Sequence, residues 1–412
     1  MKPFVSRSTS FLSALLCTGL AIAEAPRPKS SEPAAPSPPA VELTAEAQAA
    51  ADELKKSLPP DSEARRMLDD ILKGTMLGPT DGWFAMSRSY SRYSWPNLKK
   101  QFDANNDDRL TAKELGLDEE PFARLDRDSD GVVTARDLDW SEPTMSRSPA
   151  NFVFGRSDAD GNGKVTAEEF QGLFRQLGGE KDGFLSLDEI REQLQPPAAS
   201  PAPGSARPAD TPSASTLVLG LLRQEVGSHL PGPDLDALAP DFTLKSLDGK
   251  TVTLSKEIGE KPVVLIFGNF TCGPFRSQAG NIEKFYNRYR DQAKIFLVYV
   301  REAHPQDGWW MNSNRRIGID PKQPLTDNER FAVAQTCQKH LDVDLPFLVD
   351  TINDAAGATY SGMPNRLYVI DTKGRIAFKN ARGPFGFKLR EMEQALILNL
   401  AESSKDHSAA GR

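Results

Sequence analysis

A twelve-residue acidic pattern recurs in the first half of the chain, and it constrains the fold more than any other sequence feature. Side chains that carry oxygen stand at alternate positions of the best copies, position 6 is a turn residue, and position 12 is an acid. Position 8 is apolar in all four copies: Leu110, Val133, Val165 and Leu185. Alternating oxygen atoms around a tight turn suit a divalent cation held between two helices. The pattern therefore predicts short helices flanking each loop, with the apolar residues of paired loops in contact.

The two best copies are interpreted as calcium-binding EF-hand loops. The loop from Asp158 to Glu169 meets every requirement, including a glutamate at position 12. The loop from Asp126 ends in Asp137, whose shorter side chain we expect to reach the ion less well. The predicted ligands, with backbone carbonyls at position 7, are Asp126, Asp128, Asp130, Val132, Thr134, Asp137, Asp158, Asp160, Asn162, Lys164, Thr166 and Glu169.

The first and fourth copies depart from this pattern. Asp108 replaces the turn glycine of the first loop, which is tolerable because Asp adopts the left-handed conformation more readily than most residues. The fourth copy begins at Gly178, and we expect it to pair with the third while binding weakly or not at all. The first two loops start so close together that one helix should serve both. The predicted ligands are Asp103, Asn105, Asp107, Arg109, Thr111 and Glu114 in the first loop, and weakly Glu180, Asp182, Ser186 and Glu189 in the fourth.

The first residues of the chain are typical of an export signal. Lys2 and Arg7 precede the apolar run 11–23, which ends in a small-x-small cleavage motif. This run is shorter than the ~20 residues that a membrane-spanning helix needs, so we expect no transmembrane anchor. Leu16 stands where a lipoprotein signal has a small residue, which disfavours lipid attachment at Cys17. We therefore predict an exported protein, periplasmic or secreted.

Composition divides the 412 residues into six segments. A formal net charge of −7 argues against nucleic acid as a partner, because phosphate binding needs a basic face. Two runs rich in Pro, Ala and Ser cannot bury a core, so we expect extended spacers there. We predict a signal peptide over 1–23, a disordered segment over 24–44, an EF-hand domain over 45–194, a Pro-rich linker over 195–215, a thiol domain over 216–403 and a disordered tail over 404–412.

The region 216–403 has the pattern of an α/β domain with a mixed sheet. Val263–Phe267 and Ile295–Val300 are continuous apolar runs typical of central strands. Leu367–Ile370 and Arg375–Phe378 flank a short polar turn and predict a hairpin.

Cys272 follows the first central strand and opens a helical pattern. The local sequence is Cys-Gly-Pro-Phe, so Phe275 stands where a dithiol site would have its second cysteine. Free backbone N–H groups at a helix start favour a thiolate, so we expect a lowered pKa and a nucleophilic sulfur at Cys272. Cys337, on a predicted helix, is either a resolving thiol for Cys272 or a buried helix thiol.

Several short motifs in this region together resemble the iodothyronine deiodinases and their exported or microbial relatives. The resemblance covers roughly residues 216–400, and its motifs are Phe267-Gly268, Thr271-Cys272, Pro274-Phe275, Glu302–Trp309, Met363–Val369 and Gly383–Phe387. It implies an α/β thioredoxin-like domain of the peroxiredoxin type after the all-α EF-hand module, with cysteine in place of selenocysteine. It also implies that Pro364 is a cis-proline opposite the thiol.

The resemblance further implies a reductive thiol oxidoreductase. The site residues it suggests are Cys272 as nucleophile, Thr271 beside it, Glu302 and His304 as proton donors, and Pro364 and Arg366 on the substrate side. An imidazole titrates near neutrality, which independently favours His304 as a proton donor. The implied partners are Ca²⁺, an external thiol reductant and a halogenated aromatic substrate. The alternative is a calcium-dependent binding or scaffold protein whose thioredoxin-like fold is catalytically idle.

Overall fold

The computed structural model describes residues 41–74, 88–140, 149–179, 183–186, 190, 210–384 and 386–410. The predicted signal peptide and most of the Pro-rich linker lie outside these ranges. Among the described residues, no helix has both the length and the apolar character that crossing a membrane would require.

One eight-stranded mixed sheet forms the centre of the described chain. Its strand order is β1-β8-β7-β4-β5-β6-β2-β3. The strands are β1 (Tyr90–Ser91), β2 (Thr243–Ser246), β3 (Thr251–Thr253), β4 (Val263–Gly268), β5 (Lys294–Tyr299), β6 (Phe347–Val349), β7 (Arg366–Ile370) and β8 (Ile376–Lys379). The predicted central strands, the β7–β8 hairpin and the mixed sheet are confirmed. The sheet fits the α/β thioredoxin-like domain that the resemblance implied.

Sixteen helices among the described residues accompany the sheet. In the first half they are α1 (Ala45–Ser57), α2 (Glu63–Leu72), α4 (Trp95–Phe102), α5 (Ala112–Leu115), α6 (Glu119–Leu125), α7 (Ala135–Leu138), α8 (Pro149–Ser157) and α9 (Ala167–Gln176). In the second half they are α11 (Ala214–Leu222), α12 (Leu254–Glu257), α13 (Gly273–Arg276), α14 (Ala279–Tyr289), α15 (Asn312–Arg316), α16 (Asp327–Leu341), α17 (Ala355–Thr359) and α18 (Leu389–Ala410).

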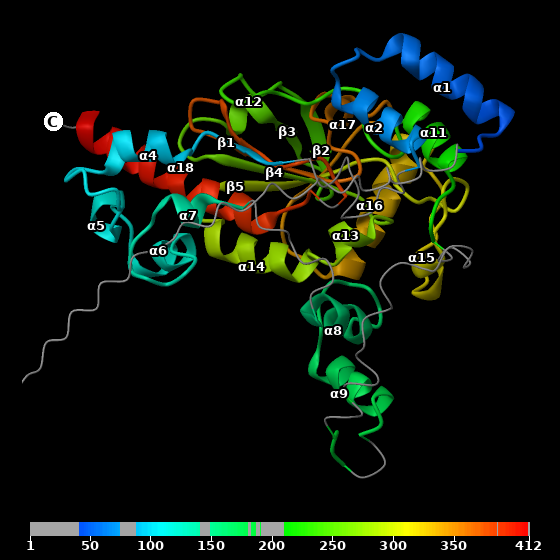
Figure 1. Ribbon diagram of the computed structural model, residues 1–412, viewed down its shortest axis with the longest axis horizontal. Helices are drawn as coiled ribbons and strands as arrows, with labels where there is room; N and C mark the ends of the chain where they lie inside the picture. The colour runs from blue at the N-terminus through cyan, green and yellow to red at the C-terminus, as the bar shows by residue number, and fades with distance from the viewer. Residues whose placement is uncertain are drawn as a thin grey trace, which may run out of the picture. The chain divides into compact units, whose positions relative to one another are not determined.

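Strands β4 and β5 are parallel and almost wholly buried, which decides where the site forms. Parallel strands end at the same edge of a sheet, so the segments after Gly268 and after Tyr299 emerge side by side. β7 runs antiparallel to β4 and pairs Arg366 with Phe267, so its beginning meets the same edge. Three chain segments therefore converge there. In Figure 1, α14 and α18 lie on one side of the sheet, and α12 and α17 on the other.

The first two acidic loops form a pair, as the apolar residues at position 8 predict. Leu110 and Val133 make an antiparallel bridge, with both N–H···O distances at 2.9 Å. Asp108 adopts a left-handed φ of 62°, as expected. The expectation of one helix shared by both loops is wrong. Gly116, with a φ of 65°, ends α5, and α6 begins separately at Glu119.

The paired loops share a hydrophobic core with the α/β domain. Leu98, Leu110 and Leu125 belong to the same buried cluster as the strands of the sheet. Polar contacts add to it: the Trp140 indole Nε1 donates to Gln394 Oε1 at 2.8 Å, and the Tyr93 hydroxyl bonds Glu402 at 2.9 Å. β1 also pairs with β8, although the sequence suggested no strand in this region.

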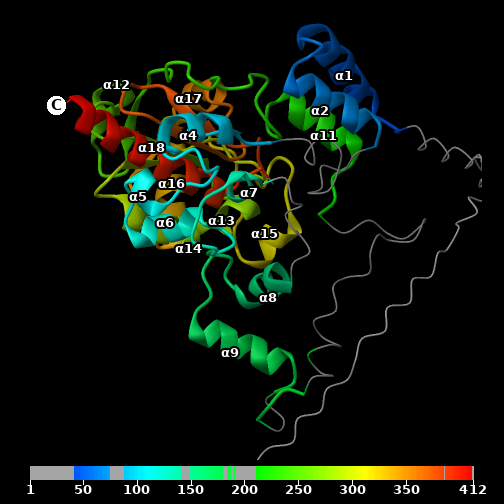
Figure 2. The same ribbon diagram turned by 60° about the vertical axis from the view of Figure 1, so that its left-hand side comes forward.

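Helices α1, α2 and α11 form a second, separate apolar cluster and lie side by side (Figure 2). α11 begins at Ala214, just before the predicted domain boundary at 216. At the other end of the chain, α18 continues to Ala410, into the tail predicted to be disordered from 404. Lys405 on this helix contacts the Gln101 carbonyl of α4, a tertiary contact that sequence periodicity does not reveal.

Replacing Leu110 by Ala should destabilise the protein by ~2–5 kcal/mol, because it removes a fully buried side chain from the shared core and leaves a cavity. Urea unfolding followed by circular dichroism measures the loss. Leu325→Ala is the matched control, since Leu325 is 79% exposed and its truncation should change stability by less than ~0.5 kcal/mol. Equal effects of the two substitutions would contradict the shared core.

Candidate functional site

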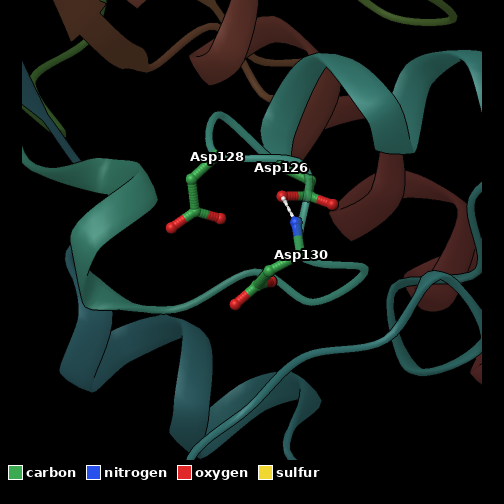
Figure 3. Close-up of side chains that lie close together, drawn as sticks. All are labelled: Asp126, Asp128 and Asp130. Carbon is green, nitrogen blue, oxygen red and sulfur yellow. Dashed lines mark hydrogen bonds between the residues drawn. The ribbon is translucent and has the colours of Figure 1, made fainter.

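Among the described residues, two groups of carboxylates have their oxygen atoms close enough together to hold one metal ion. Asp126, Asp128 and Asp130 form one group (Figure 3), and Asp158, Asp160 and Glu169 form the other. Within each group the candidate ligand oxygens all lie within 4.8 Å of one another. Hard oxygen ligands clustered at this spacing are the donor set that Ca²⁺ prefers. Both groups come from the loops with the most complete sequence pattern, so the residues present fit calcium.

The second and third loops differ at position 12, as the sequence suggested. Glu169 of the third loop belongs to its carboxylate group, whereas Asp137 of the second does not. Both residues cap the following helix by accepting from a threonine N–H, at 2.9 Å in each case. The longer glutamate reaches the ligand group while it caps, and the shorter aspartate does not. In the third loop the Asp158 Oδ1 is buried without a hydrogen-bond partner, which a cation would satisfy.

The first loop has the expected hairpin geometry but a less complete set of carboxylates. Asp103 accepts N–H groups from Asp107 and Asp108, both at 3.2 Å. Glu114 closes the loop by accepting from Ala104 N and Thr111 N. In the fourth loop, Glu180, Asp182 and Glu189 lie outside the described residues, and Ser186 alone of its predicted ligands is described.

The Cys272 sulfur lies at the edge of the sheet where the three segments converge. Its side chain is 1% exposed, and the Asn365 amide Nδ2 donates to Sγ at 3.3 Å. Asn365 directly follows Pro364, and the Met363–Pro364 peptide bond is cis, as the resemblance implied. Asn269 joins the two segments, because its Nδ2 donates to the Pro364 carbonyl at 2.9 Å.

The prediction of a lowered thiol pKa is not supported by the geometry. Burial raises the pKa of Cys272 to about 11, because the thiolate loses its hydration. The α13 helix that begins after it has four residues, too few to supply a substantial dipole. Hydrogen bonds from the Phe275 backbone and Asn365, and the nearby Arg276 charge, lower the pKa but do not offset burial.

Glu302 is fully buried beside the thiol segment. Its Oε2 accepts from the Thr271 hydroxyl at 2.7 Å and from the Thr271 backbone N–H at 2.8 Å. Its Oε1 accepts from the Tyr299 hydroxyl. Burial raises the pKa of Glu302, and these donors act in the opposite direction. A buried carboxyl with a raised pKa can store a proton, so the predicted donor role remains chemically reasonable.

His304 has a different environment from the one predicted. Burial lowers its pKa to about 4, so the imidazole is neutral at pH 7 and does not act there as a cationic acid. Nδ1 lies 3.2 Å from the Trp309 carbonyl, which assigns the proton of the neutral ring to Nδ1. Its backbone N–H donates to Thr271 Oγ1 at 2.9 Å. His304 therefore helps to hold Thr271.

The remaining predicted residues are buried. Cys337 is a free thiol in α16 with a pKa raised by burial, which matches the alternative of a buried helix thiol. Its role as a resolving thiol remains a prediction. The Arg366 guanidinium is fully buried in β7 without a hydrogen-bond partner among the described residues. Its place on the substrate side remains a prediction.

Comparison with known proteins agrees with this geometry. Residues 234–399 match the family model of iodothyronine deiodinase, and residues 153–174 match an EF-hand model. Thyroxine 5-deiodinase of Gallus gallus is 34% identical over 167 residues, which is 40% of this chain and 60% of the relative. Type I iodothyronine deiodinase of Xenopus laevis is 31% identical over 134 residues, 32% of this chain and 51% of the relative.

The chain therefore spans between about half and three-fifths of the length of these curated relatives. Among solved structures, the thioredoxin domain of a thiol-disulfide oxidoreductase from Bacteroides vulgatus is 18% identical. That match covers 38% of this chain and 94% of the other, with a TM-score of 0.27. The similarity to the deiodinase family rests on the family model and the sequence relatives.

Among the residues that hold the site, the sequence did not predict Asn269, Arg276, Tyr299 and Asn365. Each is a polar side chain in or next to an apolar run, and each is buried. Asn365 could have been suggested by its place directly after the expected cis-proline. The others depend on contacts between segments that are distant in sequence, and no local pattern marks them.

Replacing Asn365 by Ala should raise the pKa of Cys272 further, by about one to two pH units, because a hydrogen bond to a charged acceptor is worth ~1.5–3 kcal/mol. The sign follows from the donor, which stabilises the thiolate more than the thiol. The pH profile of iodoacetamide alkylation, in a Cys337→Ser background, measures this midpoint. Asn281→Ala, an exposed asparagine on α14, is the control. An unchanged midpoint in Asn365→Ala would show that the amide does not stabilise the thiolate.

Proposed function

We propose that this protein is an exported, calcium-binding thiol oxidoreductase that removes halogen reductively from an aromatic substrate. The observation that carries the proposal is the Cys272 sulfur beside the Thr271–Glu302 network, within a deiodinase family domain. The site has one thiol and no neighbouring dithiol partner at Phe275, so its chemistry consumes an external reductant.

The proposed reaction starts with attack of the Cys272 thiolate on the halogen. The carbon–halogen bond breaks, the ring carbon takes up a proton, and the sulfur becomes a sulfenyl halide. One external thiol then displaces halide and leaves a mixed disulfide on Cys272. A second external thiol releases Cys272 and carries away the disulfide of the reductant. The aromatic carbon is reduced, and two external thiols are oxidised.

Glu302 is the proposed source of the proton. Its raised pKa keeps part of the carboxyl protonated at higher pH than an exposed glutamate would allow. The Thr271 hydroxyl donates to Glu302, so it connects this carboxyl group to the segment that carries Cys272. His304 contributes by holding Thr271 through its backbone N–H. The 1% exposure of Cys272 means that a substrate gains access when side chains around the sulfur move.

The proposed protein also binds calcium and is exported. Asp158, Asp160 and Glu169 supply a full set of carboxylates, and an unpartnered Asp158 oxygen favours cation binding there. The export signal at residues 1–23 lies outside the described residues. A calcium-rich extracytoplasmic compartment would suit loops of this kind.

One observation favours a second candidate, a calcium-dependent binding protein with an idle thiol. A cysteine with a pKa near 11 is mostly protonated at pH 7, and protonated thiols are poor nucleophiles. The presence of the Thr271–Glu302 network favours the enzyme, because an idle fold has no need to bury a carboxyl group beside the thiol.

Cys272→Ser should abolish thiol-dependent release of iodide from an iodinated phenol, because serine cannot accept the halogen and be regenerated by thiols. Iodide release in the presence of dithiothreitol is the measurement. Cys337→Ser is the matched control and should retain most of the activity, since excess external thiol replaces a resolving cysteine. Iodide release that survives in Cys272→Ser would contradict the role of Cys272 as the nucleophile. A parent protein that releases no iodide would favour the binding protein.

Glu169→Gln should weaken calcium binding at the third loop by at least about tenfold, because position 12 supplies the bidentate carboxylate of an EF-hand. Isothermal titration calorimetry with CaCl₂ measures the affinity and the number of sites. Glu168→Gln changes the neighbouring glutamate, which lies outside the carboxylate group, and is the control. The same titration curve for both variants would mean that calcium does not bind through Glu169.

A further inference from the structure

The third acidic loop touches the segment that carries the thiol. Its Gly161 carbonyl accepts from Arg276 Nε at 3.3 Å, and its Gly163 carbonyl accepts from the Gly280 backbone N–H at 3.2 Å. Arg276 ends α13, the helix that starts directly after Cys272, and Gly280 lies in α14. The candidate calcium loop and the nucleophile are therefore joined through one side chain.

Arg276 holds the backbone on the other side of the sulfur as well. Its Nη1 donates to the Phe270 carbonyl, and its Nη2 donates to Asn314 Oδ1 at 2.7 Å. Asn314 in turn donates to the Thr271 carbonyl at 2.8 Å. The guanidinium is buried, with the residue 4% exposed, and its charge lies close enough to Cys272 to favour the thiolate. Arg276 therefore fixes the two residues before Cys272 and supplies positive charge near the sulfur.

The third loop packs closely against its neighbouring segments. A Cβ on Gly163 would lie 1.9 Å from the Arg276 carbonyl oxygen, and one on Gly161 would lie 2.4 Å from Ile317 Cδ1. Both glycines have left-handed φ angles, 79° and 70°, that the tight turn of the loop requires. Between them and just beyond stand two predicted ligands, Asn162 and Lys164. Lys164 also pairs with Glu283 of α14 at 2.8 Å.

We propose that calcium in the third loop activates Cys272 through Arg276, which acts as a positioning residue. This inference rests on the calcium binding included in the proposed function. An ion held by Asp158, Asp160 and Glu169 fixes the peptide from 161 to 164, and with it the carbonyl that orients the Arg276 guanidinium. A fixed guanidinium stabilises the thiolate and holds the Phe270–Thr271 backbone. By linkage, the thiolate form of the protein binds calcium more tightly than the thiol form.

The test measures iodoacetamide alkylation of Cys272 at one fixed pH, in the full chain with Cys337→Ser, with CaCl₂ or with a chelator. We expect calcium to raise the rate by about fivefold or more, the lower end of usual coupling between sites. Glu169→Gln should remove the calcium effect, whereas Asp126→Asn in the second loop should keep it. Arg276→Lys keeps the charge but loses the forked hydrogen bonds, and it should also remove the effect. Circular dichroism establishes that each variant is folded.

The outcomes distinguish this inference from the function on which it rests. If calorimetry shows calcium binding that depends on Glu169 but the alkylation rate is the same with and without calcium, the coupling is wrong and calcium binding stands. If no calcium binds at the third loop, both the coupling and the proposed calcium binding at this loop are wrong. If Asp126→Asn also removes the acceleration, the second loop transmits the effect and the role of Arg276 is overturned. Should Arg276→Lys fail to fold, the contrast between Glu169→Gln and Asp126→Asn still decides.

Discussion

A carboxyl group without contact with water organises the thiol site. Burying Glu302 is costly unless donors satisfy both oxygens, and here Tyr299 and Thr271 supply them. Tyr299 ends β5 and Thr271 follows β4, so satisfying the carboxyl requires the ends of both strands to be in register. The position of Thr271 fixes that of Cys272, the next residue. The placement of the sulfur thus depends on the hydrogen bonds that the buried Glu302 carboxyl needs within the apolar core.

The burial that organises the site also lowers the fraction of Cys272 that is present as thiolate. A sulfur with 1% exposure loses hydration of its thiolate, and its pKa rises to about 11. Asn365 and Arg276 partly offset this effect, one by a hydrogen bond and one by charge. Groups from several segments therefore set the pKa of Cys272, and this pKa depends on the positions of those segments. Arg276 matters most in this respect, because it contacts both the thiol segment and the third acidic loop.

The acidic loops could be read closely from the sequence because their geometry is local. Ligand spacing, the glycine or aspartate of the turn and the threonine that caps the following helix all lie within twelve residues. The contrast between Glu169 and Asp137 follows from one methylene of length. What spacing did not predict was the break between α5 and α6, where Gly116 allows the chain to turn instead of continuing one helix.

The sequence by itself determined the central strands, the β7–β8 hairpin, the acidic loops with their capping residues and the place of Cys272 after β4. Periodicity, turn residues and ligand spacing are properties of neighbouring residues, and a resemblance in short motifs carries the expected cis-proline. The tertiary structure alone decided the protonation of the site. Cys272 and His304 have pKa values far from those expected, because burial depends on which segments pack over a side chain. It also decided that the paired acidic loops share the core of the α/β domain and that Arg276 joins the third loop to the thiol. Those contacts connect residues more than a hundred positions apart, and no local pattern records them.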